Sequence, residues 1–237
     1  MILPGIVSTS ERENVPIKIV LFGKSGSGKT CTAATAPAPL FLDSEGGTLP
    51  LARADVARKP TKTLREAIDV LKWLAADPEP RAYWKTLVID SVSDLAEREL
   101  AHALTVTANG KPPDGRAVYG DLATRFLDFF RLVRELPYFH VVCVAKMATR
   151  EDGVTHATYY GPSMPGQKLA EALPYIFDGS YCVHVKPDRT RVLLCQTAFQ
   201  HDTKDRSGGA LSAEEPLNLT HIFDKIATFL TIGEKNG

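Results

Sequence analysis

The chain has 237 residues, of which 44% are hydrophobic and 24% charged, so it is long enough to bury a core and fits one globular domain. Lysine and arginine total 28, as do aspartate and glutamate, which gives a formal net charge of zero. This balance excludes a global field that would draw the protein to nucleic acid, so a polyanion must bind a local patch or an assembled surface. We expect a single domain over residues 1–237, with 1–15 as an N-terminal arm and 16–232 as the core.

Neither a leader peptide nor a membrane span is expected. Residues 1–16 lack a basic stretch followed by an apolar one, and no run approaches the roughly 20 apolar residues that span a bilayer. We therefore expect a cytoplasmic protein with no membrane partner. Its cysteines should be reduced thiols without a disulfide, because no CxxC pair occurs among Cys31, Cys143, Cys182 and Cys195.

The first part of the chain reads as strands alternating with helices. Ile17 to Phe22 is predicted to be a strand, followed by a glycine-rich loop and a short helix from Thr30 to Ala36. A second strand, Leu40 to Asp43, ends in a polar turn, and the chain is then turn-rich until about Thr61. An amphipathic helix follows up to residue 77, as indicated by Leu64, Ala67, Ile68, Leu71 and Leu74.

The middle of the chain continues this alternation. Thr86 to Asp90 is a continuous apolar run closed by aspartate, as in a strand buried on both faces of a parallel sheet. Ser91 to about Leu104 is predicted to be a helix, Thr107 to Gly120 a loop, and Tyr119 to Leu136 a second helix. Val141 to Ala145 is the fourth buried strand.

The last part of the chain is predicted to close the domain. Arg150 to Gly166 reads as a long loop without periodicity. Ile176 to Val185 and Arg191 to Thr197 form a terminal hairpin, and Leu219 to Leu230 a final helix after the polar stretch from His201 to Pro216. The fold class is therefore α/β: a mostly parallel sheet with helices on both faces, a C-terminal antiparallel hairpin and ligands at the carboxyl ends of the strands.

The glycine-rich loop carries the strongest chemical signal. Gly23 to Thr30 reads G-x-x-x-x-G-K-[ST] between a predicted strand and helix, the context in which backbone N–H groups cradle nucleotide phosphates. Lys29 should reach the β- and γ-phosphates of ATP, and Thr30 should offer its hydroxyl to Mg²⁺. The dinucleotide pattern G-x-G-x-x-G is absent, so a Rossmann oxidoreductase is disfavoured. The expected nucleotide-binding residues are Gly23, Lys24, Ser25, Gly26, Ser27, Gly28, Lys29, Thr30 and Cys31.

Two acidic residues are candidates for the rest of an ATPase site. Asp90 ends a buried strand and can hold magnesium through water, the alternative being a strand-end capping aspartate. Ser91 follows it, so the carboxylate that orients the attacking water must come from elsewhere. Glu45, beyond the neighbouring strand, is the preferred catalytic candidate; Asp43 is a poorer rival, and a solvated turn glutamate is the alternative reading.

These segments resemble a known family. Residues 41–45, Phe-Leu-Asp-Ser-Glu, are similar to the strand of RecA-type recombinases that carries the catalytic glutamate, and residues 88–92, Val-Ile-Asp-Ser-Val, to their Walker B strand. The resemblance covers roughly residues 15–232 and implies a RecA-like ATPase core. By position, it also makes 107–120 the first DNA-binding loop, 141–146 the sensor strand, 150–166 the second DNA-binding loop and 167–178 the helix before the terminal hairpin.

The chain departs from that family in two places. Ala145-Lys146 stands where a glutamine-type sensor is usual, so phosphate sensing would run through Lys146 or be absent. The sequence also leaves no room for the additional domains of full recombinases. A core of this size resembles phage-encoded RecA-like ATPases implicated in single-strand DNA annealing and recombination, which would act in the cytoplasm of the bacterial host.

The resemblance also suggests residues that act between subunits and on DNA. Lys204 and Arg206 are similar to the pair that RecA-type and hexameric helicase ATPases insert into a neighbour's nucleotide, so they would be catalytic in trans; the alternative is a solvated charged turn. This implies self-association into a ring or filament. Basic side chains and stacking tyrosines would bind single-stranded DNA. A single-stranded-DNA-binding protein is a further candidate partner. The candidate DNA-binding residues are Lys111, Arg116, Arg150, His156, Tyr159, Tyr160 and Lys168.

Three functions remain open on the sequence. The preferred one is a DNA-stimulated, oligomeric RecA-like ATPase that promotes annealing or strand exchange. The second is a P-loop switch or loader that uses ATP to change its affinity for a protein partner and never touches DNA. A small-molecule kinase is the third and is disfavoured, because the Lys-x-Arg pair lies late in the chain instead of in a basic lid. The remaining histidines have no ligand spacing, so no zinc site is expected.

Overall fold

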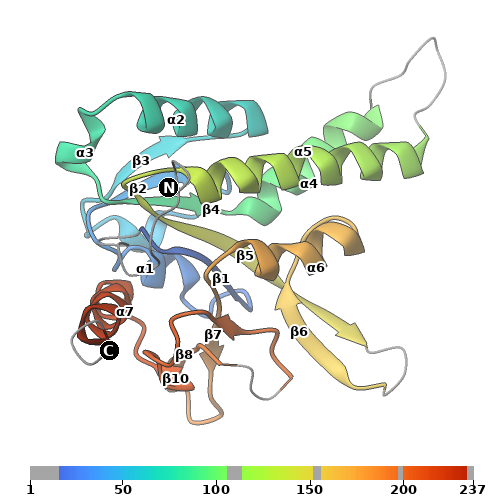
Figure 1. The fold of residues 1–237 in the computed structure, drawn as a ribbon. Coiled ribbons are helices and arrows are strands. Elements are labelled where there is room, and N and C mark those ends of the chain that lie inside the picture. Colours follow the sequence, from blue (N-terminus) through green and yellow to red (C-terminus); the bar gives the residue numbers. More distant parts are fainter. Residues whose placement is uncertain (1–15, 106–113, 152–155, 197–199, 234–237) are drawn as a thin grey trace, which may run out of the picture.

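The computed structural model describes residues 16–105, 114–151, 156–196 and 200–233. Its centre is a sheet whose strands follow the order β10-β8-β7-β1-β5-β4-β2-β3 (Figure 1). The six strands from β7 to β3 are parallel, and β8 and β10 are antiparallel to their neighbours, so the predicted fold class is confirmed. These strands are β1 (Lys18–Gly23), β2 (Pro39–Asp43), β3 (Ala57–Pro60), β4 (Thr86–Asp90), β5 (His140–Glu151), β7 (Gly179–Val185), β8 (Arg191–Leu194) and β10 (Glu214–Glu215).

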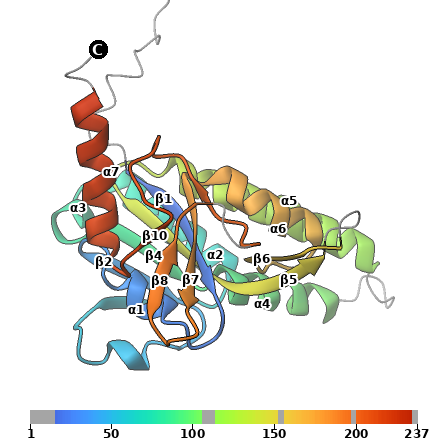
Figure 2. The ribbon, with the colours of Figure 1, turned by 90° about the horizontal axis from the view of Figure 1, so that it is seen from below.

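Helices cover both faces of the sheet, as the apolar runs of its inner strands require. Residues of β1 alternate between the two faces: Val20 and Phe22 pack in one buried cluster, Ile19 and Leu21 in the other. The first cluster lies under α2 (Leu64–Ala76), α4 (Val92–Thr105), α5 (Gly115–Glu135) and α6 (Gln167–Ile176). The second lies against α1 (Lys29–Ala33) and α7 (Leu219–Gly233), which stand on the opposite side of the strands from α5 (Figure 2).

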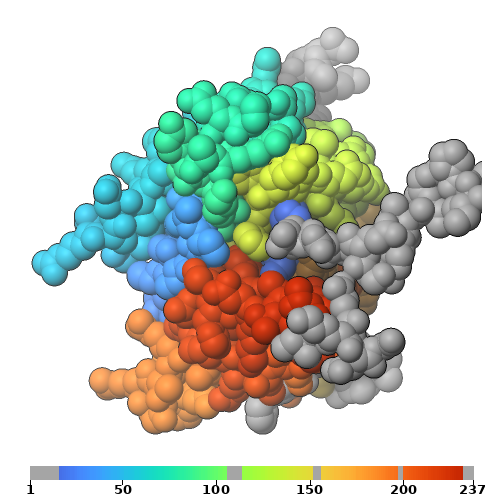
Figure 3. Space-filling model, turned by 60° about the vertical axis from the view of Figure 1, so that its left-hand side comes forward, coloured from blue at the N-terminus to red at the C-terminus, as the bar shows by residue number. Residues whose placement is uncertain are grey.

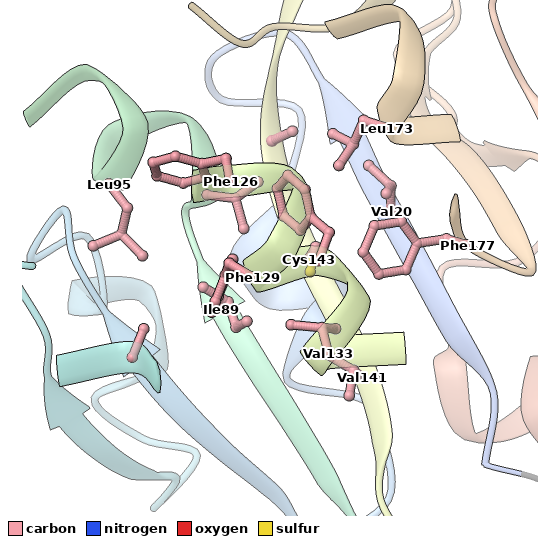
Figure 4. Packing of buried hydrophobic residues seen from close by; sticks show 14 of the residues in the cluster. Val20, Ile89, Leu95, Phe126, Phe129, Val133, Val141, Cys143, Leu173 and Phe177 are labelled. Atoms are coloured by element: carbon pink, nitrogen blue, oxygen red, sulfur yellow. The ribbon is translucent and has the colours of Figure 1, made fainter. Parts of the chain in front are cut away.

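The aromatic residues of α5 build the centre of the first cluster. Phe126, Phe129 and Phe130 are fully buried, and Phe130 meets Phe177 with ring centroids 5.7 Å apart. Figure 4 shows this helix face pointing onto the strands, with Ile89 and Cys143 beneath it. On the other side α7 lies at the surface beside the strands, where the red C-terminal segment fills much of the face in Figure 3. The helices packed on the two faces therefore hold the strands in place, and this also fixes the edge of the sheet at which the parallel strands end.

Short elements complete the fold. They are the 3₁₀ helix η2 (Leu49–Leu51), the helix α3 (Pro80–Tyr83), and the strands β6 (Thr158–Pro162) and β9 (Lys204–Asp205), of which β9 pairs with β7. All four cysteines are free thiols, and burial raises the pKa of Cys182 to about 12. Within the described ranges, no helix combines the length and apolarity needed to cross a membrane.

Most predicted elements are confirmed, but the two predicted DNA-binding loops are partly wrong. Arg116 belongs to the first turn of α5, because the Asp114 carboxylate accepts its backbone N–H at 3.0 Å and caps the helix. The stretch from 150 to 166 is largely a hairpin arm: β5 runs on to Glu151 and pairs antiparallel with β6. This arm projects away from the main sheet (Figure 1). Lys111 lies outside the described residues.

Candidate functional site

The glycine-rich loop after β1 has the backbone of a phosphate-binding loop. Gly26 and Gly28 have φ values of 73° and 106°, a region that favours glycine, and Gly28 directly precedes α1. Gly23 is closely packed, since a Cβ there would lie 2.7 Å from the Val183 carbonyl oxygen. A Cβ at Gly26 would meet nothing within 4 Å, so there is open space beside this glycine. Residues 23–31 therefore remain the predicted phosphate-binding loop, with two glycines in the left-handed region before α1.

Lys29 is folded over this loop. Its Nζ donates to the carbonyl oxygens of Gly23 and Lys24, each at 3.0 Å. Burial lowers the pKa of Lys29, and the negative charges of Asp90 and Glu45 oppose that shift. The ammonium group is thus held at the mouth of the loop, close enough to two carboxylates for their charges to act on it.

Thr30 and Asp90 meet across the sheet edge. The Thr30 hydroxyl donates to Asp90 Oδ2 at 2.7 Å, which joins the first turn of α1 to the end of β4. Asp90 is only 6% exposed, and burial raises its pKa to about 6, partly offset by the hydrogen bond from Thr30. Magnesium prefers oxygen ligands and usually takes one or two carboxylates beside phosphates and waters. A hydroxyl and a carboxylate at hydrogen-bond distance beside a phosphate-binding loop therefore fit this ion.

Glu45 reaches the same edge through a pair of serines. The Ser91 hydroxyl donates to Glu45 Oε1. The Ser91 backbone N–H donates to Ser44 Oγ at 3.0 Å, and the Ser44 backbone N–H donates to the Asp90 carbonyl oxygen at 2.8 Å. The ends of β2 and β4 are thus tied together, with Asp43 opposite Asp90 in the register. Glu45 is solvent-exposed at this edge, where a carboxylate can meet a water molecule.

Sequence reasoning missed the two serines that hold this arrangement. The signal was available, because the dipeptide Asp-Ser ends both adjacent strands, at residues 43–44 and 90–91. In the structure these dipeptides lie side by side, and both serine side chains are buried. Their hydrogen bonds hold the ends of β2 and β4 together and fix the position of the Glu45 carboxylate.

Asp43, the poorer catalytic candidate, has structural partners. Its carboxylate accepts the Gly46 backbone N–H at 2.7 Å and pairs with Arg58 Nη1 at 3.1 Å. The Asp43 side chain is 2% exposed, so it has little access to a water molecule at the loop mouth. These contacts shape the turn on which Glu45 is carried.

Lys146, the candidate sensor, lies beside the loop on β5. It stands opposite Gly23 in the register, and its backbone N–H donates to Ser93 Oγ at 2.9 Å. Its ammonium group pairs with Glu97 at 2.5 Å. Burial would lower the pKa of Lys146, but the hydrogen bond to Glu97 and the charges of Glu97 and Glu45 raise it overall. The side chain is therefore charged and tethered to α4.

The hairpin arm of β5 and β6 carries three of the candidate DNA residues and touches the loop. Tyr159 is 39% exposed, whereas Tyr160 lies with its ring centroid 6.0 Å from Lys24 Nζ and 5.2 Å from His201. Arg150 donates to the Pro162 carbonyl oxygen at 2.8 Å, so it stabilises the arm. The arm thus links a candidate DNA surface to the phosphate-binding loop.

The other candidate DNA residues are dispersed. Arg116 and Lys168 are exposed on the first turns of α5 and α6. His156 is exposed and pairs with Glu151 at 2.6 Å. These residues are accessible, but the structure does not gather them with the tyrosines into one cluster.

Lys204 and Arg206 lie at the C-terminal end of α6. Lys204 Nζ donates to the carbonyl oxygens of Pro174 and Phe177 at 2.6 and 2.9 Å. Burial and the neighbouring charge of Arg206 lower the pKa of Lys204 to about 8. Arg206 is exposed and donates to the Tyr175 carbonyl oxygen at 3.2 Å. Within this subunit, Lys204 caps a helix, and Arg206 has the freer side chain.

The sequence matches the AAA domain family over residues 15–207. No curated protein matches the chain in sequence. A solved structure of the RadB recombinase is 14% identical with a TM-score of 0.40, covering 76% of this chain and 80% of that one. A KaiC-like protein from Pyrococcus horikoshii is 15% identical with a TM-score of 0.43, covering 77% and 80%.

Proposed function

The chain belongs to the AAA domain family, and we propose that it is a RecA-like ATPase that hydrolyses Mg-ATP and acts on single-stranded DNA. The observation that carries the proposal is the 2.7 Å hydrogen bond from Thr30 to Asp90 at the mouth of a complete phosphate-binding loop. A hydroxyl that follows the loop lysine and a strand-end aspartate are the two magnesium positions of P-loop ATPases.

In this proposal, the loop residues bind and orient the nucleotide. Backbone N–H groups of residues 23–31 cradle the phosphates, and Lys29 exchanges its bonds to the Gly23 and Lys24 carbonyls for phosphate oxygens. Thr30 and Asp90 would hold Mg²⁺, which when bound supplies positive charge against the β- and γ-phosphates.

Glu45 would then orient and deprotonate the attacking water. Its exposed carboxylate lies at the same sheet edge as Asp90 and is fixed by the Ser91 hydroxyl. That hydrogen bond leaves Oε2 of Glu45 to accept a water proton. The charge of Glu45 helps to raise the pKa of Lys146, so the two side chains sense each other. Lys146 would respond to the loss of the γ-phosphate and transmit it to α4 through its ion pair with Glu97.

The DNA part of the proposal depends on the hairpin arm. Tyr159 is exposed for stacking on an unpaired base, a contact worth about 1–3 kcal/mol. Tyr160 lies under the ammonium group of Lys24, so phosphate binding that moves Lys24 would also affect the arm. This contact supports coupling between ATP turnover and DNA. Arg206, which is exposed and donates to the Tyr175 carbonyl oxygen, is the candidate that would reach a nucleotide of an adjacent subunit in a ring or filament.

Two observations favour the second candidate, a P-loop switch that acts on a protein partner. The formal net charge is zero, and the Arg150 guanidinium donates to a carbonyl oxygen of the hairpin arm. Such a protein would bind and hydrolyse ATP without any response to DNA.

Steady-state ATP hydrolysis with and without single-stranded DNA separates the two candidates. The assay is run at two salt concentrations with Glu45→Gln as the blank. Stimulation by DNA that falls at the higher salt supports the DNA-dependent ATPase, because phosphate contacts are salt-sensitive. Hydrolysis that DNA leaves unchanged at both salts refutes it and favours the protein-partner switch.

A further inference from the structure

Arg191, the first residue of β8, stands beside the phosphate-binding loop. β7 runs parallel to β1, with Cys182 opposite Phe22, so the next residues of β7 pass alongside the loop. Arg191 is opposite Val185 in the antiparallel pair of β7 and β8. The strand pairing therefore brings Arg191 to the carboxyl edge of the sheet, where the loop lies.

The side chain of Arg191 is on the same face of the sheet as α1. Side chains alternate along a strand, so Arg191 shares a face with Leu193 and not with Val192. Leu193 packs in the buried cluster that contains Ala33 of α1, whereas Val192 packs against the opposite cluster. Arg191 thus continues the α1 face outward from the core, toward the start of that helix.

The guanidinium group reaches the loop itself. A Cβ built on Gly28 would lie 3.7 Å from Arg191 Nη1 and 4.0 Å from its Cδ. The side chain is exposed, and in the part of the chain that the structure describes it has no hydrogen bond or ion pair. An arginine with no carboxylate partner beside a phosphate-binding loop has its donors available for a ligand.

The position of the charges indicates what that ligand is. The strand order β8-β7-β1-β5-β4-β2 puts Asp90 and Glu45 on one side of the loop strand and Arg191 on the other. On its side Arg191 places an exposed positive charge beside the loop at Gly28, while the exposed Lys24 of the loop lies against Tyr160. A guanidinium without an anionic partner beside this loop would be stabilised by an anion bound in the loop.

We propose that Arg191 binds the α- and β-phosphates of the nucleotide from within the same subunit. Gly28 belongs to the backbone cradle that holds these two phosphates in P-loops, whereas the loop lysine serves the β- and γ-phosphates. A guanidinium beside Gly28 can donate two parallel hydrogen bonds to them. The inference rests on the proposed function and identifies Arg191 as a determinant of affinity for ATP and ADP alike, with no part in cleavage of the γ-phosphate.

The test measures the Kd values of ATP, ADP and inorganic tripolyphosphate by calorimetry for wild type and Arg191→Ala. Arg189→Ala is the matched control, because Arg189 is exposed in the turn just before β8 and is not among the groups that a Cβ on Gly28 would meet. We expect Arg191→Ala to weaken all three ligands about tenfold or more, consistent with the loss of charged hydrogen bonds. Arg191→Lys should recover part of the loss, and Arg189→Ala should bind like wild type.

Several results would overturn this assignment. One is unchanged binding in Arg191→Ala; another is weakening of ATP alone, which would place the contact at the γ-phosphate. Weaker ATP and ADP binding with unchanged tripolyphosphate binding would move the contact to the nucleoside. Because wild type is titrated in parallel, failure of the proposed function is distinguishable: wild type itself would then bind none of the three.

Discussion

Replacing one carboxylate oxygen with an amide group, in Glu45→Gln and in Asp43→Asn, distinguishes a carboxylate that serves catalysis from one that serves stability. Glu45→Gln retains Oε1, so the Ser91 hydroxyl still has its acceptor, but the amide cannot take a proton. Loss of a general base costs typically 10²–10⁴ in rate, so kcat should fall by about that factor. Because Glu45 is exposed, neither the Tm nor the affinity for Mg-ATP should change measurably.

Asp43→Asn should have the opposite effect. Asp43 is 2% exposed, and its carboxylate accepts the Gly46 N–H and pairs with Arg58. Arg58 is 52% exposed, so solvent screens the ion pair and the weakened hydrogen bonds dominate the cost. We expect about 1 kcal/mol of lost stability, or roughly 2–4 °C in Tm for a chain of this size.

The two variants are compared by single-turnover ATP hydrolysis under rapid quench and by thermal unfolding. The expected pattern is a large rate loss with an unchanged Tm for Glu45→Gln, and a lower Tm with a rate within a few-fold of wild type for Asp43→Asn. Glu45→Gln that hydrolyses ATP at the wild-type rate would refute our assignment of the catalytic carboxylate. A rate loss confined to Asp43→Asn would transfer the role to that residue.

Three further predictions concern the loop, the pH dependence and the subunit interface. Gly23→Ala should abolish ATP binding and lower the Tm, because its Cβ would lie 2.7 Å from the Val183 carbonyl oxygen; calorimetry showing wild-type affinity would contradict this. Burial and a nearby lysine lower the pKa of His140 to about 4, below the unfolded value near 6.5. The contribution of His140 to the free energy of unfolding is therefore fully present above pH 6.5, and up to about 3 kcal/mol of that free energy is lost as pH falls toward 4. Urea unfolding of His140→Phe should show a smaller loss over the same pH range. Arg206→Ala should restore hydrolysis when mixed with subunits that lack a working loop; assembly without recovered activity would argue against a role in trans.

The sheet was largely predictable because its inner strands are buried on both faces. The apolar runs 19–22, 87–89 and 141–145 are fully buried, and each lies within a strand that the sequence predicts. β3 was missed because Ala57–Pro60 is an edge strand with exposed, charged residues and therefore lacks the apolar signal. Edge strands depend on a partner strand more than on their own sequence.

The hairpin arm was missed for a related reason. β6 pairs with the end of β5 through backbone contacts such as Arg150 opposite Tyr159, and neither strand alternates apolar and polar residues. The start of α5 was placed too late because Asp114-Gly115 reads as a turn, although Asp114 caps the helix. In each case, a tertiary partner or a cap decided the structure, and the local pattern did not.

The candidate site was predictable to the extent that strand order determines it. Thr30, Asp90 and Glu45 follow strand ends, and parallel strands bring such ends to one edge. The helix-capping position of Lys204 and the approach of Arg191 to the loop depend on how α6 and the terminal hairpin pack. No spacing in the sequence encodes those contacts.

The central claim, that the loop binds Mg-ATP, is tested most directly by calorimetric titration of wild type and Lys29→Ala with ATP, with and without Mg²⁺. The account predicts binding by wild type that is tightened by Mg²⁺, and no detectable binding by a Lys29→Ala variant with an unchanged circular dichroism spectrum. Wild-type affinity in Lys29→Ala would contradict it, because ATP would then be bound without the lysine that the loop holds at its mouth.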